Sequence, residues 1–549
     1  MLLLLNLGWN SSAQKLYLKI SSTLSKENIV IDSIGYNPNH SNTKTINEET
    51  SLFLDKLVKI GFITAKKESY KKINDSTFLF QISMGKKEDF IHIYIGRNSQ
   101  LKSLFVFEQK SDTLILPFTE VESFLNLTLN RLEKKGFALA KLKLINIQRK
   151  LNYLEAELEL ISENRRQLND IIIKGYVNFP KGHSSNLKRL YKNRIFNQEN
   201  LKNIYVDFNK FRFIKQLKYP EILFTKDSTK VYVYLEKAKA NSFDGFIGFS
   251  NNEANKIIFN GYLDLTLNNI LNTGETVSLY WKSDGKDQKT FNGTIELPYI
   301  FKSPFGLKAQ LNIFKQDSTF QNTKTELALG YFFNYNSRLY IGYQTTESSD
   351  IQNQNITSIS DFNNSFINTN FEFLDFKNDN FLFPEKTKIN LKIGFGTRRS
   401  KLITNSQALF AVDLKHSIYL NEKNSFNIKS QNFYLKSNDY IINELYRFGG
   451  INSIRGFNEN SLQANFFTSI LTEYRYALAP SIYVHSIIDY GYYQDKTSNN
   501  KGNLLGFGFG FGLLTKNGLF NIIYANGSTK EQAVKGSNSI VHISFKTNF

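Results

Sequence analysis

The second half of the chain consists of short runs in which apolar and polar residues alternate, and this pattern restricts the possible folds more than any other feature. From about residue 241 onward there is no helical periodicity, and segments of about ten residues end in Asn, Ser, Asp, Lys or Gly. In Gly506 to Leu514, GFGFGFGLL, the glycines fall on one face of a strand and the phenylalanines on the other. Alternation with a period of two predicts strands that are apolar on one side.

These strands have to close into a barrel if the chain crosses a membrane. No apolar run reaches the roughly eighteen residues that a membrane helix needs. Lipid provides no hydrogen-bond partner for the backbone, so only helices and closed barrels can span it. The roughly 310 residues after residue 240, at about nineteen per strand and turn, predict sixteen strands, an even number as in bacterial barrels. We therefore expect a transmembrane antiparallel β-barrel over residues 241–549. Long polar inserts, such as Glu347 to Ser365, predict surface loops between its strands.

Composition agrees with amphipathic strands and argues against several other classes of protein. Phe and Tyr are abundant, with 48 and 29 residues, while the net charge is +19. The lysines are scattered and form no basic helix or RNA-binding motif, so we expect no nucleic-acid partner. Attraction to anionic lipid headgroups, or simple solvation of the charges, explains them better. The absence of cysteine excludes disulfides and thiolate metal sites.

The first part of the chain has a mixed pattern of helices and strands that repeats about three times. Each copy has an opening strand, a helical stretch and two further β-rich runs, and the first two copies carry a Gly-Phe step after the helix. The predicted modules span residues 15–87, 88–164 and 167–239, with helices expected near residues 48–60, 119–135, 185–191 and 198–208. In the second copy, apolar residues at three- and four-residue spacing support the helix, among them Leu125, Leu127, Leu129 and Leu132. One α+β domain of an unrelated type is the alternative.

A glycine-rich stretch interrupts the strands in the last fifth of the sequence. RFGGINSIRGF, from Arg447 to Phe457, contains Gly449 and Gly450 and does not alternate, so it predicts a loop with Arg455 near its tip. Two acidic residues follow at strand-like intervals, Glu473 and Asp489, and the apolar neighbours of both predict that their carboxylates face the lumen. The alternative for Arg455 is an arginine in solvent outside the cell.

This combination resembles the BamA/TamA superfamily of outer-membrane assembly barrels, whose (V/I)RGF loop folds back into the lumen. The resemblance implies that Arg455 pairs with Glu473, with Asp489 or with both, and that this bond pins the loop. Gly456 would let the backbone turn, and Phe457 would pack on the wall. Gly491 completes the Asp-x-Gly sequence that begins at Asp489.

The repeated modules resemble the POTRA modules that form the periplasmic arm in this superfamily. A sheet edge in such a module can accept an extended segment of another chain as an added strand. The resemblance therefore implies unfolded outer-membrane proteins as clients, and periplasmic or lipoprotein accessory subunits as further partners.

Both ends of the sequence carry patterns related to export. Residues 1–13, MLLLLNLGWNSSA, predict a secretory signal cleaved after Ala13, with a buried first strand as the alternative. Near the other end, Ser539 to Phe549 predicts a last strand whose apolar face includes Phe545 and the terminal Phe549. A terminal aromatic is typical of outer-membrane barrels, and this strand should pair with the first one, near residues 243–250.

The resemblance to this superfamily implies an outer-membrane protein that inserts or folds client barrels. We expect clients to be guided along the arm and then paired, strand by strand, at a gate between the first and last barrel strands. A two-partner secretion pore, which exports an unfolded polypeptide through the lumen, is the alternative. A passive porin is less favoured because porins need no arm.

The sequence contains no pattern that indicates catalysis. The six histidines lie far apart in the sequence, and none has the spacing of a metal ligand. A dinucleotide site requires a helix after its Gly-x-Gly pattern, and no helix is expected after the one near Gly506. We expect no enzyme activity, cofactor or metal. An outer-membrane lipase or protease is the third hypothesis, and it would place a Ser or Asp beside one of the histidines.

Overall fold

The computed structural model divides the chain into two compact units. One comprises Met1–Gln167 with Arg194–Asn200, and the other Leu168–Asn193 with Leu201–Phe549. The first holds two α/β modules, and the second holds a third module and the barrel. The structure describes residues 15–96, 101, 112–150, 153–251, 257–284, 288–352, 358–377, 380, 382–401, 403–516, 518–530 and 539–548. The predicted signal, residues 1–13, lies outside them.

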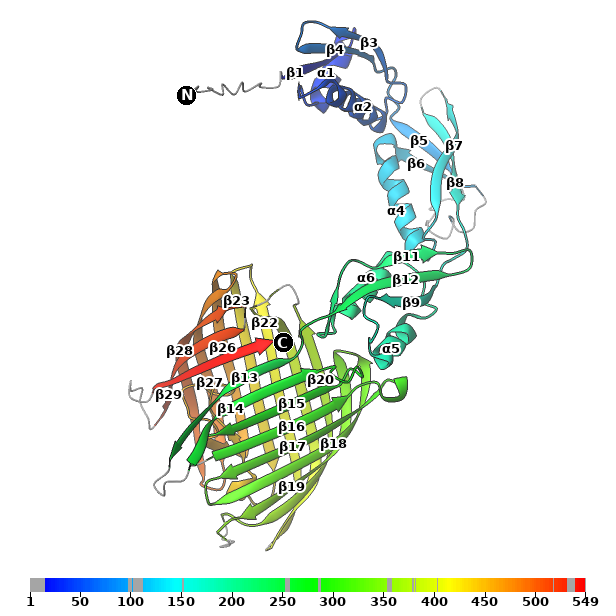
Figure 1. Ribbon diagram of the computed structural model, residues 1–549. Helices are drawn as coiled ribbons and strands as arrows, with labels where there is room; N and C mark the ends of the chain where they lie inside the picture. The colour runs from blue at the N-terminus through cyan, green and yellow to red at the C-terminus, as the bar shows by residue number, and fades with distance from the viewer. Residues whose placement is uncertain are drawn as a thin grey trace, which may run out of the picture. The chain divides into compact units, whose positions relative to one another are not determined.

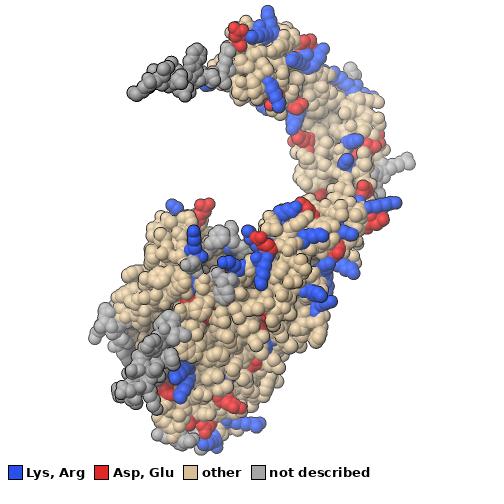
Figure 2. Space-filling view, viewed as in Figure 1, with Lys and Arg blue, Asp and Glu red and all other residues tan. Residues whose placement is uncertain are grey.

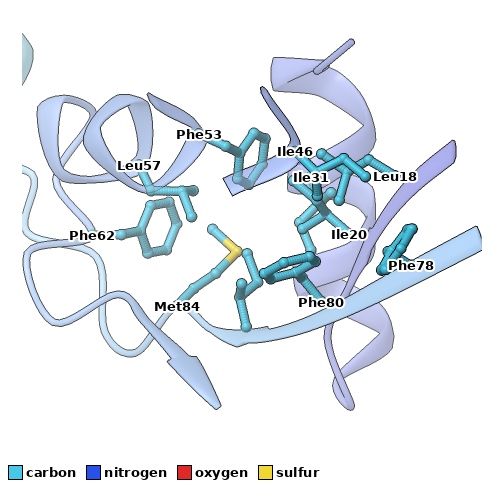
Figure 3. Close-up of a cluster of buried hydrophobic side chains, with 11 residues drawn as sticks. Leu18, Ile20, Ile31, Ile46, Phe53, Leu57, Phe62, Phe78, Phe80 and Met84 are labelled. Carbon is cyan, nitrogen blue, oxygen red and sulfur yellow. The ribbon is translucent and has the colours of Figure 1, made fainter. Parts of the chain in front are cut away.

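The first module is a four-stranded sheet with two helices. Its strands, in the order β2-β1-β4-β3, are β1 Leu16–Ser21, β2 Asn39–His40, β3 Lys66–Lys72 and β4 Thr77–Ser83, and its helices are α1 Ser25–Ile34 and α2 Thr43–Lys59. Figure 3 shows Phe53 and Leu57 of α2 in one buried cluster with Phe80 and Met84. Helix α1 was not predicted. It buries only Ile31, so its sequence shows no clear apolar stripe.

The second module repeats this sheet order. Its strands, in the order β6-β5-β8-β7, are β5 Phe90–Tyr94, β6 Thr113–Pro117, β7 Lys141–Arg149 and β8 Leu154–Ile161, with the 3-10 turn η1 Phe118–Glu120 and helix α4 Val121–Lys134. The Gly-Phe step ends α2 and α4 in the same way. Gly61 and Gly136 have φ of 109° and 96°, and the following Phe N–H groups donate to Leu57 and Leu132. Glycine is favoured there because the backbone is left-handed.

The third module belongs to the same unit as the barrel. Its strands are β9 Leu168–Lys174, β10 Ile214–Gln216, β11 Glu221–Phe224 and β12 Thr229–Lys237, and its helices are α5 Lys181–Tyr191 and α6 Gln198–Asn209. The parallel strand β9 and the antiparallel β10 and β11 all pair with β12. Phe179, Phe208, Phe211 and Phe213 pack against one another in its interior.

Sixteen antiparallel strands form a closed barrel, which confirms the predicted fold class (Figure 1). No helix in the described part of the chain is long and apolar enough to cross a membrane. The strands are β13 Ser242–Asn251, β14 Ile257–Asn268, β15 Thr276–Ser283, β16 Gln288–Leu297, β17 Phe305–Gln316, β18 Phe320–Asn334, β19 Ser337–Asp350, β20 Phe362–Phe376, β21 Glu385–Ser400, β22 Thr404–Tyr419, β23 Asn424–Lys436, β26 Phe466–Ala479, β27 Ile482–Asp495, β28 Asn500–Leu514, β29 Leu519–Thr529 and β30 Ser539–Asn548.

One predicted surface loop, residues 347–365, is shorter than expected. Strand β19 continues to Asp350 and β20 begins at Phe362, with Glu347 paired to Asn363. Runs of Ser, Thr and Asn are typical of loops. Here β19 pairs with β18 on one side and β20 on the other, and these backbone hydrogen bonds keep the polar residues in a strand.

The two faces of the barrel wall differ as the alternation predicted. Phe507, Phe509 and Phe511 are exposed on the outside, and Figure 2 shows that uncharged side chains dominate the wall in view. Charged groups are instead matched in the interior: Arg338 binds Glu296 and Glu372. This distribution suits a cylinder surrounded by lipid and filled with polar groups.

Helix α5 of the third module docks on turns of the barrel. The Asn186 amide donates to the carbonyl oxygens of Lys302, at 3.2 Å, and Ser303, at 2.9 Å. His183 is fully buried and packs against the rings of Phe211 and Tyr299. Burial lowers the pKa of His183 to about 3, so the imidazole is neutral and serves as an aromatic packing group.

Candidate functional site

The segment between β23 and β26, residues 437–465, folds into the barrel lumen, and we call it the lumen loop. It contains the 3-10 turn η3 Ile442–Glu444 and a short hairpin of β24 Tyr446–Phe448 and β25 Leu462–Ala464. Its side chains are buried against the wall: Phe448, Ile454 and Phe457 form one cluster with Phe467, Leu471 and Leu504. The predicted loop with an arginine near its tip thus lies inside the barrel.

Arg455 joins this loop to two strands of the wall. Its guanidinium meets Asp489 of β27 side-on, with Nε 2.8 Å from Oδ2 and Nη2 bonded to Oδ1. The backbone N–H of Arg455 donates to the same Oδ2 at 3.0 Å. Nη1 binds Glu473 of β26. A bidentate pair of this kind fixes orientation as well as position.

The site is almost fully removed from solvent, and its charges balance locally. Arg455 is 4% exposed and Asp489 is 0% exposed. Glu473 also accepts from Nε of Arg475 at 2.8 Å, so two arginines face two carboxylates. Burial disfavours a charge at Arg455, but the hydrogen bonds and negative charges of Asp489 and Glu473 offset that cost. The guanidinium is therefore charged.

Glycines allow the loop backbone to lie directly on the wall. Gly456 has φ of 88°, and a Cβ there would lie 2.2 Å from the carbonyl carbon of Asn526 in β29. On the wall, a Cβ at Gly506 would lie 2.3 Å from the carbonyl oxygen of Arg455, and one at Gly491 would meet Ile454. No side chain fits at these three positions without moving the loop.

Gly449 and Gly450 lie in the turn after β24, with φ of 107° and 94°. A Cβ at Gly450 would meet the Glu459 carboxylate, which pairs with Lys282 of β15 at 3.1 Å. The two glycines therefore shape the loop, and Glu459 adds a contact to another part of the wall.

A second arginine site holds the base of the lumen loop, and the sequence reasoning missed it. Arg398 of β21 is fully buried, binds Asp439 at 2.7 Å and also binds Glu444. Gln407 of β22 donates to the other oxygen of Glu444 at 2.8 Å. The alternation could have indicated it, because Phe395 faces outward and residue 398 therefore faces the lumen.

Asn443 links the same end of the loop to the wall on its other side. Its amide donates to Ser348 Oγ of β19 at 2.7 Å and to the Ser360 carbonyl oxygen at 2.8 Å. Its own carbonyl oxygen accepts from Asn322 of β18 at 2.6 Å. The lumen loop is thus fastened at its base by neutral and ionic bonds and near its tip by Arg455.

The first and last strands meet along a short seam. Ser242, Phe243 and Asp244 of β13 pair with Asn548, Thr547 and Lys546 of β30, which makes three residue pairs. The neighbouring ladders are longer, with ten pairs between β13 and β14 and eight between β29 and β30. Phe545 is exposed on the outer face, and the predicted terminal aromatic, Phe549, lies outside the described residues.

No group of three His, Cys, Asp or Glu side chains within the described ranges is placed to hold a metal ion. The charged side chains near Arg455 pair with one another. The arrangement is therefore suited to holding a loop, and releasing it would require breaking several bonds at once.

Neither a family model nor a curated protein matches the chain. Among solved structures, CdiB from Acinetobacter baumannii matches with a TM-score of 0.52 at 12% identity, covering 92% of this chain and 97% of that one. CdiB from Escherichia coli matches with 0.51 at 12% identity, over 92% and 98%. BamA from Haemophilus ducreyi lacking POTRA domains 1–3 matches with 0.47 at 14% identity, over 82% and 97%. The two CdiB matches show that this chain shares their fold.

Proposed function

We propose that this chain inserts client β-barrel proteins into the outer membrane through a gate between β13 and β30. The three-pair seam is the observation that carries the proposal. Beyond Asp244, β13 continues to Asn251 with β14 as its partner, and β30 upstream of Lys546 pairs with β29. Two strand edges with free backbone groups are therefore available to a client strand.

The free energy for insertion comes from the client itself in this scheme. Each client strand gains backbone hydrogen bonds at the gate and buries its apolar face in lipid. The three α/β modules serve as a POTRA-type periplasmic arm, whose sheet edges hold the client in an extended form. The lumen loop, with Arg455 bound to Asp489 and Glu473, keeps the wall near the gate in one conformation. The closed, even-numbered barrel with its apolar outer face supports an outer-membrane location.

A disulfide across the seam tests the gate. The chain has no cysteine, so the pair Phe243→Cys and Thr547→Cys, which face each other in the register, introduces a single bond. Insertion of a model client barrel into proteoliposomes should stop on oxidation and return on reduction. The matched control is Ile522→Cys with Ile543→Cys, a facing pair between β29 and β30 that leaves the seam free. A locked seam that inserts clients at the control rate would refute the gate.

The second candidate is a two-partner secretion pore, and a cavity in the lumen favours it. This space of about 480 Å³ lies beside the lumen loop, and its lining includes Asn292, Gln310, Lys324 and Glu326 of the wall. An extended polypeptide could hydrogen-bond to such a surface once the loop moved aside. Under this function the locked seam leaves export intact, while bonds that immobilise the loop block it.

A further inference from the structure

The turn between β16 and β17 holds an aromatic side chain away from the rest of the protein. Tyr299, Phe301 and Lys302 have φ of 54°, 52° and 59°, a left-handed backbone that is uncommon outside glycine. Tyr299 is buried against the ring of His183, whereas Phe301 is 97% exposed. The docking of Tyr299 thus maintains a strained turn whose effect is to display Phe301.

A second apolar side chain is displayed at the same place: Val177, in the connection between β9 and α5, is 96% exposed. Val177 and Phe301 line one groove of about 700 Å³ between the third module and the barrel turns. Lys181 and Lys302 line the same groove, and both are exposed. The surface therefore combines large apolar groups with cations.

This groove continues the outer face of the barrel. Leu297 of β16 and Leu307 of β17 line it and are also exposed on the outside of the wall, next to Phe305. With the wall in lipid, Leu297 and Leu307 bring the apolar outer face of the barrel to the edge of the groove that Phe301 and Val177 line. Lipid that contacts Leu297 and Leu307 therefore also reaches the groove that Phe301 lines.

We propose that Phe301 and Val177 form a membrane anchor, which inserts into the adjoining leaflet while Lys181 and Lys302 bind anionic headgroups. This inference rests on the proposed membrane location of the barrel. Aromatic and aliphatic groups flanked by lysines are typical of surfaces that lie at a lipid interface. The anchor ties the third module to the membrane plane next to the barrel, in addition to the contacts of His183 and Asn186.

Quenching of tryptophan by phospholipids brominated in their acyl chains tests the anchor in the full chain. The sequence has two tryptophans, Trp9 and Trp281. With Trp9 replaced by Phe, Trp281 on β15 reports insertion of the barrel. With both Trp9 and Trp281 replaced by Phe, a single tryptophan introduced as Phe301→Trp reports the anchor. The matched control in the same background is Leu223→Trp, at an exposed site on strand β11 of the third module. Vesicles of phosphatidylcholine and phosphatidylglycerol in equal amounts should quench Trp281 and Phe301→Trp and leave Leu223→Trp unquenched.

The lysines are tested in the same assay. Each of Lys181→Gln and Lys302→Gln should lower the ratio of inserted to free anchor about fivefold in the mixed vesicles, with no effect in phosphatidylcholine alone. Quenching of Trp281 without quenching of Phe301→Trp overturns the anchor and leaves the barrel's location intact. Loss of quenching at Trp281 itself overturns the location and the anchor together. If the vesicles leave the fluorescence of Phe301→Trp unchanged and an added polypeptide changes it, the surface binds a protein, and the membrane anchor is refuted.

Discussion

At the scale of single residues, the behaviour of the lumen loop depends on buried charges that are matched one against another. Asp489 is fully buried, and Arg455 is its cation. Taking one partner out of a buried pair costs more than the pair contributes, because the remaining charge loses both its partner and its water. Arg455 is therefore the residue whose loss should free the loop.

The first prediction concerns Arg455→Ala, which leaves Asp489 buried without a cation. We expect a loss of about 3 kcal/mol in the free energy that keeps the loop docked, near the lower limit for a broken buried pair because Glu473 keeps Arg475. Ser453 is buried in the same loop, so a thiol reagent should label Ser453→Cys roughly a hundredfold faster in this variant.

A double variant separates release of the loop from misfolding of the barrel. Arg455→Ala with Asp489→Asn removes the unpaired charge, so the barrel should fold normally while labelling stays faster than in the parent. Charge reversal at Arg455 should impair client insertion, and a compensating change at Glu473 or Asp489 should partly restore it. Equal labelling and insertion in all variants would contradict a role for the pair.

The second prediction uses two neighbouring arginines on β21. Arg398 is buried against Asp439 and Glu444, whereas Arg399 lies on the outer face and is exposed. Arg398→Ala should release the base of the lumen loop, measured as faster labelling of Leu445→Cys. Arg399→Ala removes the same side chain from the same strand and should change little. Similar labelling rates in the two variants would show that the base is held by the neutral bonds of Asn443.

At the scale of elements, the joint between α5 and the barrel turns is where the fold is sensitive to acid. His183 is surrounded by aromatic rings, and a Cβ at Gly274 would lie 1.9 Å from its Cε1, so the joint closes tightly on the imidazole. Both of its ring nitrogens lack a hydrogen-bond partner among the described residues. The imidazole cannot be protonated there without losing the packing.

The third prediction is that this joint opens as the pH falls. The pKa of His183 is about 3 when buried, and about 6.5 when exposed to water. The open form binds the proton more readily, so the stability of the joint is complete above about pH 6.5 and decreases toward pH 3. At pH 5 the loss is about 2 kcal/mol.

Spin labels at Leu223→Cys on the third module and Asn421→Cys on the turn between β22 and β23 measure this opening. Their distance distribution should broaden between pH 7 and pH 5. His183→Phe keeps a planar ring but cannot be protonated, so its distribution should be the same at both values. Broadening in His183→Phe as well would assign the acid sensitivity to another group.

At the scale of the whole molecule, the arm, the lumen loop and the seam are parts of one proposed route for a client. The fourth prediction is that depletion of this protein lowers the abundance of outer-membrane barrels in general, because their strands lose the gate at which they pair. Quantitative proteomics of the outer membrane measures this directly. Loss of a single secreted product with normal barrel levels would support the export pore instead.

Local patterns were sufficient to predict the class of fold. Alternation identified the barrel and its outer face, and the Gly-Phe steps marked where α2 and α4 end. Helix α1 was missed because it buries only Ile31, so its apolar residues show no clear stripe. The predicted loop at residues 347–365 was too long, since polar strand residues are stabilised by their neighbours in the ladder and not by their own preferences.

What the sequence by itself determined was therefore the set of periodic elements and the residues that interrupt them, including Arg455, Glu473 and Asp489. Only the tertiary structure decided which charges meet. Arg398 binds groups 41 and 46 residues away, and Asn443 bonds to Ser348, 95 residues away. The closure of the barrel sets those distances, as it sets the three-pair seam, because the register of every strand depends on the ladder that precedes it. Periodicity is a property of neighbouring residues, whereas pairing of buried charges is a property of the closed cylinder.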